Sequence, residues 1–151
     1  MTGGSGADQF MGGSGNDTMT GGSGNDVYTF IRGDDQDTII DTDPFPMNQD
    51  RTVFGETINP LDLVISRQAN DLRLTIHGSS DQITVQNWFA SQSASQIETI
   101  QAGNGKTLLN TQVDQLIQAM ATFTTQTGLT WDQAIDQRPQ DVQTVLAASW
   151  Q

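Results

Sequence analysis

The stretch GGSGADQFM-GGSGNDTMT-GGSGNDVYT, residues 3–29, consists of three consecutive units of nine residues. A glycine pair opens each unit, an aspartate stands in its sixth place and a bulky apolar residue in its eighth. The aspartates are Asp8, Asp17 and Asp26, and the apolar residues are Phe10, Met19 and Tyr28. A flexible Gly/Ser linker would give no reason for this spacing. The period therefore predicts a repeat architecture in which each unit buries its apolar face against its neighbours.

The residue types in each unit also suit a bound cation. Glycines permit tight turns that direct main-chain carbonyls toward one point. Aspartate is a short, hard oxygen ligand, and calcium takes roughly six to eight such oxygens from carboxylates and carbonyls together. The last three residues of each unit suit a short strand with one face inward. If two units close one flattened coil, Asp8 lies with Asp26 on one edge and Asp17 with the next aspartate on the other.

Acidic residues are concentrated near the start of the chain. Overall, 18 Asp and Glu face 6 Lys and Arg among 151 residues, which gives a net charge of −12. Residues 1–50 hold nine of these acids and a single base, Arg32. Carboxylates at this density repel one another, so we expect calcium to neutralise and fold the repeats in one step. A nucleic-acid partner is excluded, because it would require a basic surface.

After residue 29 the period degenerates. Residues 32–40, RGDDQDTII, fit the nonapeptide with only Gly33 retained, with Asp35 in place of a glycine and Asp37 in the sixth place. Residues 41–49 contain two prolines, Pro44 and Pro46, and are predicted to form a loop. A degenerate fifth repeat is predicted over residues 48–54, with Asp50 in the aspartate position.

The second half of the chain changes from repeats to strands and then to helices. Short strands are predicted at 63–67, 72–77 and 82–86, and a hairpin at 96–109 turns at Asn104-Gly105. The last forty residues are predicted to be helical. One helix is capped by Asn110 or Thr111, a second opens on a capping box of Thr130 and Gln133, and Pro139 begins a third.

The pattern GGxGxDxUx resembles the calcium-binding nonapeptide repeats of RTX (repeats-in-toxin) proteins. Residues 61–109 resemble the β-rich segment that follows these repeats in haemolysin-type calcium-binding proteins. The resemblance covers about residues 3–120. It implies an all-β dominated fold: a calcium-binding parallel β-roll in 1–54, a β-hairpin-rich continuation packed on the roll in 55–109, and a short helical tail in 110–151 that caps it.

The resemblance also implies a set of ligands, namely the carbonyls of the second and fourth places and the carboxylate of the sixth. On one edge this set is Gly4, Gly6 and Asp8 against Gly22, Gly24 and Asp26. On the other it is Gly13, Gly15 and Asp17 against Gly33, Asp35 and Asp37. Asp50 is expected to face Asp26 from the next turn, and we expect two or more Ca²⁺ ions.

By the same resemblance, the chain is a module of a secreted or cell-surface bacterial protein that folds on calcium outside the cell. Its tail would carry the signal read by a type I secretion transporter. Thr2 stands where the last residue of a preceding repeat would be, which favours a longer array upstream. The sequence contains no apolar run long enough to span a membrane, and we expect a monomer.

Two other functions are weighed against this interpretation. The first is a carbohydrate-binding accessory module, similar to the repeat modules of alginate epimerases, with a polysaccharide as partner. The second is a calcium-dependent hydrolase. His77 is the only histidine and the chain has no cysteine, so no catalytic set can be assembled and we expect no enzyme activity.

Overall fold

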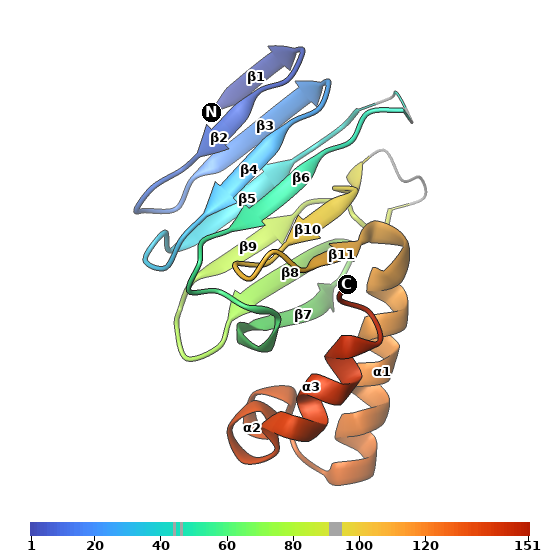
Figure 1. The fold of residues 1–151 in the computed structure, drawn as a ribbon. Coiled ribbons are helices and arrows are strands. Elements are labelled where there is room, and N and C mark those ends of the chain that lie inside the picture. The colour runs from blue at the N-terminus through green and yellow to red at the C-terminus, as the bar shows by residue number, and fades with distance from the viewer. Residues whose placement is uncertain (44, 46, 91–94) are drawn as a thin grey trace.

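The computed structural model describes residues 1–43, 45, 47–90 and 95–151. Pro44 and Pro46, on which the predicted loop depends, lie outside these residues. The strands are β1 (Thr2–Ser5), β2 (Gln9–Met11), β3 (Thr18–Ser23), β4 (Val27–Phe30), β5 (Gln36–Ile40), β6 (Arg51–Phe54), β7 (Leu63–Gln68), β8 (Asp71–Ile76), β9 (Gln82–Val85), β10 (Thr99–Gln101) and β11 (Thr107–Leu109). They form two sheets, and the strands of the repeats alternate between them (Figure 1).

The first sheet has the order β1-β3-β5-β9-β8-β7, and the second has the order β11-β10-β6-β4-β2. Strands from successive repeats in one sheet are parallel, and Thr2 pairs with Thr20 as Phe10 pairs with Tyr28. Each turn therefore lies on the turn two units away, which is the stacking that the nine-residue period predicts. Both sheets are mixed rather than purely parallel, because β7, β8 and β11 pair antiparallel with their neighbours.

The apolar residue of each repeat points into the core between the sheets. Phe10, Met19, Tyr28 and Ile39 are each at most 5% exposed. The rings of Phe10 and Tyr28 stack with centroids 5.1 Å apart and planes 11° from parallel. One large side chain per repeat gives each layer little apolar area of its own, so a layer depends on its neighbours for stability.

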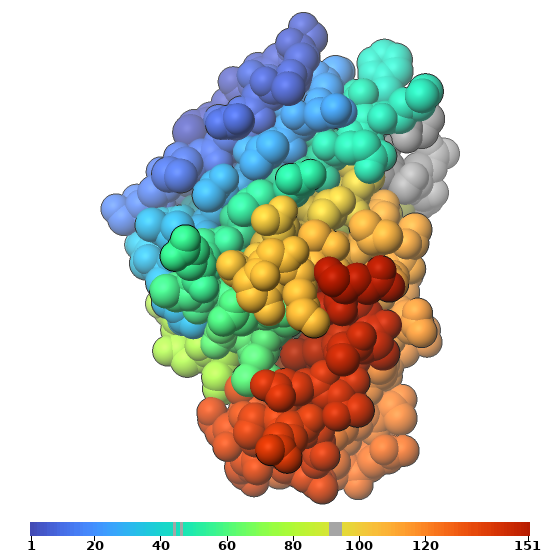
Figure 2. All heavy atoms as spheres, in the orientation of Figure 1, coloured from blue at the N-terminus to red at the C-terminus, as the bar shows by residue number. Residues whose placement is uncertain are grey.

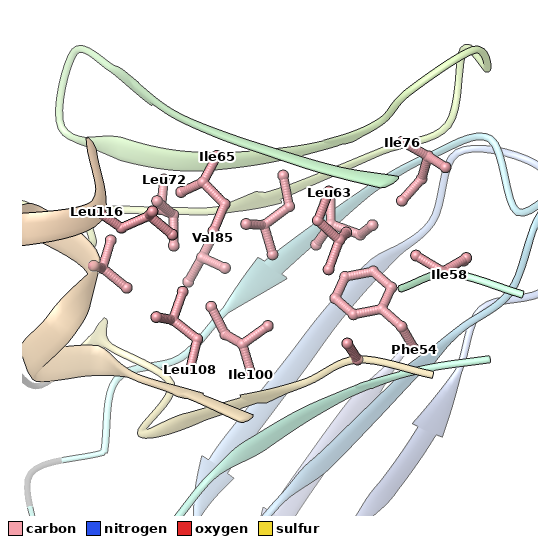
Figure 3. Close-up of a cluster of buried hydrophobic side chains, with 14 of the residues drawn as sticks. Phe54, Ile58, Leu63, Ile65, Leu72, Ile76, Val85, Ile100, Leu108 and Leu116 are labelled. Carbon is pink, nitrogen blue, oxygen red and sulfur yellow. The ribbon is translucent and has the colours of Figure 1, made fainter. Parts of the chain in front are cut away.

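Many of the buried apolar side chains come from the strands that follow the repeats, β7 to β11 (Figure 3). Ile65 and Leu72 from β7 and β8 face Ile100 and Leu108 from β10 and β11, and helix α1 (Val113–Thr127) adds Leu116. The predicted hairpin is confirmed, since β10 and β11 pair around residues 102–106. Strands β9 and β10 also continue the parallel rows of β5 and β6, so the repeats and the later segment share both sheets.

Two further helices follow α1. They are α2 (Trp131–Gln137) and α3 (Pro139–Ala147), and Figure 1 shows them below the sheets beside α1. The capping box is confirmed, because Thr130 Oγ1 accepts from the N–H of Gln133 at 3.2 Å. The predicted cap of the first helix, Asn110 or Thr111, was placed one or two residues too early. Residues Asn110–Gln112 form a 3₁₀ turn (η3), so Gln112 occupies the N-cap position.

The helical tail is joined to the sheets at two points. Gln151 exchanges main-chain hydrogen bonds with Thr107 at 2.8 and 2.9 Å, which extends the edge of β11. In Figure 2 this end of the chain (red) accordingly lies on the hairpin (yellow to orange). His77, which follows β8, lies against Asp132 and Asp136 of α2. Among the described helices, none is both long and apolar enough to cross a membrane.

Candidate metal centre

A column of carboxylates runs along one edge of the two sheets, where the first and third turns stack. The N–H of Asp8 donates to Oδ1 of Asp26 at 2.9 Å, and the N–H of Asp26 donates to Oδ1 of Asp50 at 2.7 Å. The N–H of Asp50 continues the column by donating to Oε2 of Glu98 at 2.7 Å. The carboxylates of Asp26, Asp50 and Glu98 thus each use one oxygen to accept from the turn before, which leaves the other oxygen for a different partner.

The opposite edge repeats the arrangement over a shorter distance. The N–H of Asp17 donates to Oδ1 of Asp37 at 2.8 Å. The register of β5 and β9 then sets Ile83 beside Asp37, so this column of sixth-place carboxylates ends there.

Asp35 stands in the fourth place of its unit, where the regular repeats have glycine, and it also adopts a positive φ. Its φ is 66°, in the left-handed region that asparagine and aspartate tolerate better than most residues. Its Oδ2 accepts from the N–H of Gly15 at 3.0 Å, and its own N–H donates to Asp81 at 3.1 Å. Asp81 also accepts from the N–H of Gly33 at 2.9 Å. The departure from the repeat pattern therefore preserves the turn and adds a carboxylate to it.

Close stacking of the turns requires glycine at two of the predicted ligand positions. A Cβ on Gly22, whose φ is 106°, would lie 2.3 Å from the carbonyl oxygen of Gly4. A Cβ on Gly24 would lie 2.1 Å from the carbonyl oxygen of Gly6. These contacts show that carbonyl oxygens of the first turn point at the backbone of the third. The predicted glycines that also have left-handed φ are Gly6, Gly13, Gly15 and Gly33.

The sixth-place carboxylates are buried without a compensating charge. Asp26, Asp37 and Asp50 are at most 3% exposed, whereas Asp8 and Asp17 are partly exposed. Within the described part of the chain, Oδ2 of Asp26 and Oδ2 of Asp37 have no hydrogen-bond partner. Burial raises the pKa of Asp26, and it raises that of Asp37 to about 6.

A cation fits this donor set. A buried, unpaired carboxylate is unfavourable unless a positive charge or a donor reaches it. Calcium prefers oxygen ligands from carboxylates and carbonyls, which are the groups gathered at both edges. In the described residues, no three His, Asp or Glu side chains converge on one point. An ion here would therefore take most of its ligands from main-chain carbonyls, as glycine-rich turns permit.

Sequence reasoning missed several carboxylates that the fold brings to these edges, among them Asp41, Asp43, Asp81 and Glu98. Glu98 carries a detectable signal, because Glu98-Thr99-Ile100 repeats the spacing of an acid and an apolar residue two places later. Asp81-Gln82-Ile83 has the same spacing. In the structure, however, Ile83 lies beside Asp37, so Asp81 is in register with Asp35 and not with a sixth-place carboxylate. Asp41 was placed in a loop, yet it is only 1% exposed.

Comparison with known families covers both halves of the chain. Residues 2–39 match the RTX calcium-binding nonapeptide repeat (4 copies). Residues 71–112 match the haemolysin-type calcium binding protein related domain, which includes Asp81 and Glu98. No curated protein matches the chain.

Proposed function

This chain belongs to the RTX family of calcium-binding repeat proteins, and we propose that it is a module that folds on binding calcium outside the cell. The observation that carries the proposal is the pair of buried carboxylate columns. Asp26 and Asp37 each bury an oxygen that has no partner in the described residues. Calcium would neutralise these groups and so couple binding to folding of the repeats.

Circular dichroism during a calcium titration tests this function. The expected result is a gain of β structure with millimolar calcium, because extracellular modules bind with Kd of about 10⁻⁴–10⁻³ M. Magnesium at the same concentrations should substitute poorly, since it requires a tight octahedral shell and gives up water reluctantly. A spectrum in a chelator that already matches the calcium-bound spectrum would refute the proposal.

A matched pair of double variants links this response to the columns. Asp26→Asn with Asp37→Asn removes two buried carboxylates, whereas Glu56→Gln with Asp114→Asn removes two exposed ones. Both variants change the net charge by the same amount. Only the first should raise the calcium concentration at the folding midpoint severalfold. Equal shifts in the two variants would mean that calcium acts through overall charge rather than at the columns.

We also propose that the helical tail supports type I secretion of a larger bacterial protein. Residues 110–151 follow the segment that resembles the haemolysin-type domain and form three helices after η3. Fusing residues 110–151 behind a cytoplasmic passenger and co-expressing a type I transporter tests the proposal. The passenger should reach the medium with this fusion and remain in the cell with a fusion to residues 1–54. Retention of both fusions would leave the tail a structural cap.

A cleft favours carbohydrate binding as a second candidate function. It has a volume of about 490 Å³ and lies between η1 (Pro60–Asp62), the β10–β11 hairpin and α3. Asn104, Lys106 and Gln143 line it, and their amide and ammonium groups can form hydrogen bonds with sugar hydroxyls. Trp150 also borders the cleft but is only 3% exposed. Titration with neutral and uronate oligosaccharides in calcium tests this function. Binding that is lost in Lys106→Ala with Gln143→Ala would support it, and no binding by the parent chain would exclude it.

A further inference from the structure

Asp41 occupies a place that the repeats reserve for glycine. Thr20 pairs with Thr2 on one side and with Ile40 on the other. The residues that follow these three are Gly21, Gly3 and Asp41. Asp41 is therefore the counterpart of the glycine that opens each turn on this edge. Its side chain points inward, as those of Asp37 and Ile39 do along β5, and it is 1% exposed.

Glycine at this place makes room for the carboxylate of the same turn. A Cβ on Gly3 would lie 2.4 Å from Oδ2 of Asp8, and a Cβ on Gly21 would lie 2.4 Å from Oδ2 of Asp26. At Asp41 the same place carries a side chain. The side chain is a second carboxylate beside that of Asp50.

The carboxylate of Asp41 is only partly satisfied by the surrounding protein. Oδ1 of Asp41 accepts from the N–H of Asp43 at 3.2 Å, but Oδ2 has no partner in the described residues. Pro44 and Pro46 have no N–H to offer. No ion pair among the described residues involves Asp41 or Asp50.

Like charges in this position need a positive charge between them. The carboxylate of Asp41 lies next to that of Asp50, and the buried carboxylate of Asp26 is also near it. The hydroxyl of Tyr28 is also buried near these groups, and it too has no partner in the part of the chain that the structure describes. Two buried polar atoms, Oδ2 of Asp41 and the hydroxyl oxygen of Tyr28, are therefore without partners in the described residues.

We propose that Asp41 and Asp50 hold a further calcium ion, separate from those of the regular repeats, at the last turn of this edge. The inference rests on the proposed calcium-dependent function, because it assigns additional ligands of the same ion. Two carboxylates supply only part of the roughly six to eight oxygens that calcium takes, so main-chain carbonyls and water supply the others. Asp41 directly follows β5 and Asp50 directly precedes β6, so the ion would join the ends of these two strands.

Calorimetric titration of the whole chain with calcium, paired with equilibrium dialysis, tests the inference. Asp41→Asn keeps the shape of the side chain and removes its charge, and Glu56→Gln is the control with the same charge change at an exposed site. The expected result is one fewer bound ion per chain in Asp41→Asn and an unchanged number in Glu56→Gln. Asp41→Gly, which restores the residue of the other turns, should also lose one ion and should still fold in calcium.

The outcomes separate this inference from the proposed function. If both Asp41 variants bind the same number of ions with unchanged affinities, the inference is overturned but the proposed function is not. In that case a proton shared by Asp41 and Asp50 would hold their carboxylates together. If Asp41→Asn fails to fold in calcium, the ion count of Asp41→Gly decides. Failure of the parent chain to bind calcium would overturn the proposed function and the inference with it.

Discussion

The main-chain N–H of Asp26 donates to Oδ1 of Asp50 across 2.7 Å, although 24 residues separate them in the chain. Oδ1 of Asp26 is in turn the acceptor for Asp8. Asp26 therefore joins three turns, whereas Asp8 joins only two. The two residues occupy the same place in their repeats, but the structure gives them unequal roles.

This inequality predicts the effect of removing each charge. Asp26→Asn should weaken calcium binding and the cooperativity of folding much more than Asp8→Asn, because solenoid stability depends on nearest-neighbour interfaces. Asp26 is also fully buried, whereas Asp8 is partly exposed. Calorimetric titration of the two variants measures the difference. An equal loss, or a larger loss for Asp8→Asn, would show that the assignment of turns to sites is wrong.

A second prediction concerns glycine at the second place of the repeat. Gly22→Ala should destabilise the calcium-bound chain by about 1–2 kcal/mol or more, because alanine would have to adopt a left-handed φ. It would also collide with the carbonyl of Gly4. Gly4→Ala should change stability by less than about 1 kcal/mol, since its Cβ would meet open space. Urea unfolding in saturating calcium measures both, and similar losses would contradict the stacking of these turns.

A third prediction concerns pH and the contact between His77 and α2. His77 Nδ1 lies 2.7 Å from Asp132, and Nε2 lies 2.8 Å from Asp136. These hydrogen bonds raise the pKa of His77 above its usual value of 6.5. Their stabilising effect is therefore complete below pH 6.5 and is lost as the pH rises through the raised value. Because both carboxylates are largely exposed, we expect about 1 kcal/mol from the pair.

His77→Gln should accordingly lower the free energy of unfolding at pH 6 and have little effect at pH 9. Urea unfolding at both values, in saturating calcium, measures this difference. The control is the double variant Asp132→Asn with Asp136→Asn, in which His77→Gln should have no further effect. A loss in His77→Gln that is the same at both pH values would mean that the ring matters for packing and not for charge.

The fourth prediction concerns deletion of residues 130–151. The number of bound calcium ions should stay the same, because every predicted ligand precedes the helices. The free energy of unfolding in calcium should fall by more than about 3 kcal/mol, since Trp131, Leu146 and Trp150 are part of the core. Calorimetric titration and urea unfolding of the truncated chain measure both quantities. Loss of an ion would show that the tail contributes to a site.

The regular part of the molecule could be predicted from the sequence because its spacing is periodic. The period places Asp8 with Asp26 and Asp17 with Asp37, and the structure stacks these pairs. It even identifies Asp50 after a long, irregular turn, because the strand that follows keeps the register. Local patterns were equally informative for the hairpin at Asn104-Gly105, where the turn residues determine the conformation.

The remaining features depend on contacts between segments that no local pattern connects. Strand β9 joins the row of β5 after an antiparallel excursion through β7 and β8, so the position of Asp81 follows from that topology. The contact of His77 with α2 depends on how a helix packs more than 50 residues later. Asp41 follows two apolar residues and precedes a proline-rich loop, and only the register with Gly21 shows that its side chain points inward.

Strands β9 and β10 are the last parallel strands of the two sheets, next to β5 and β6. This position distinguishes one end of the stacked repeats from the other. Ile83, Val85 and Ile100 of these strands are part of the apolar core between the sheets (Figure 3). Antiparallel pairing with β8 and β11 ends the parallel row on this side. A repeat gains stability by packing on a neighbour that is already ordered, so we expect the repeats next to β9 and β10 to order first. Ordering would then advance from residue 50 toward residue 1, against the direction in which the chain is synthesised.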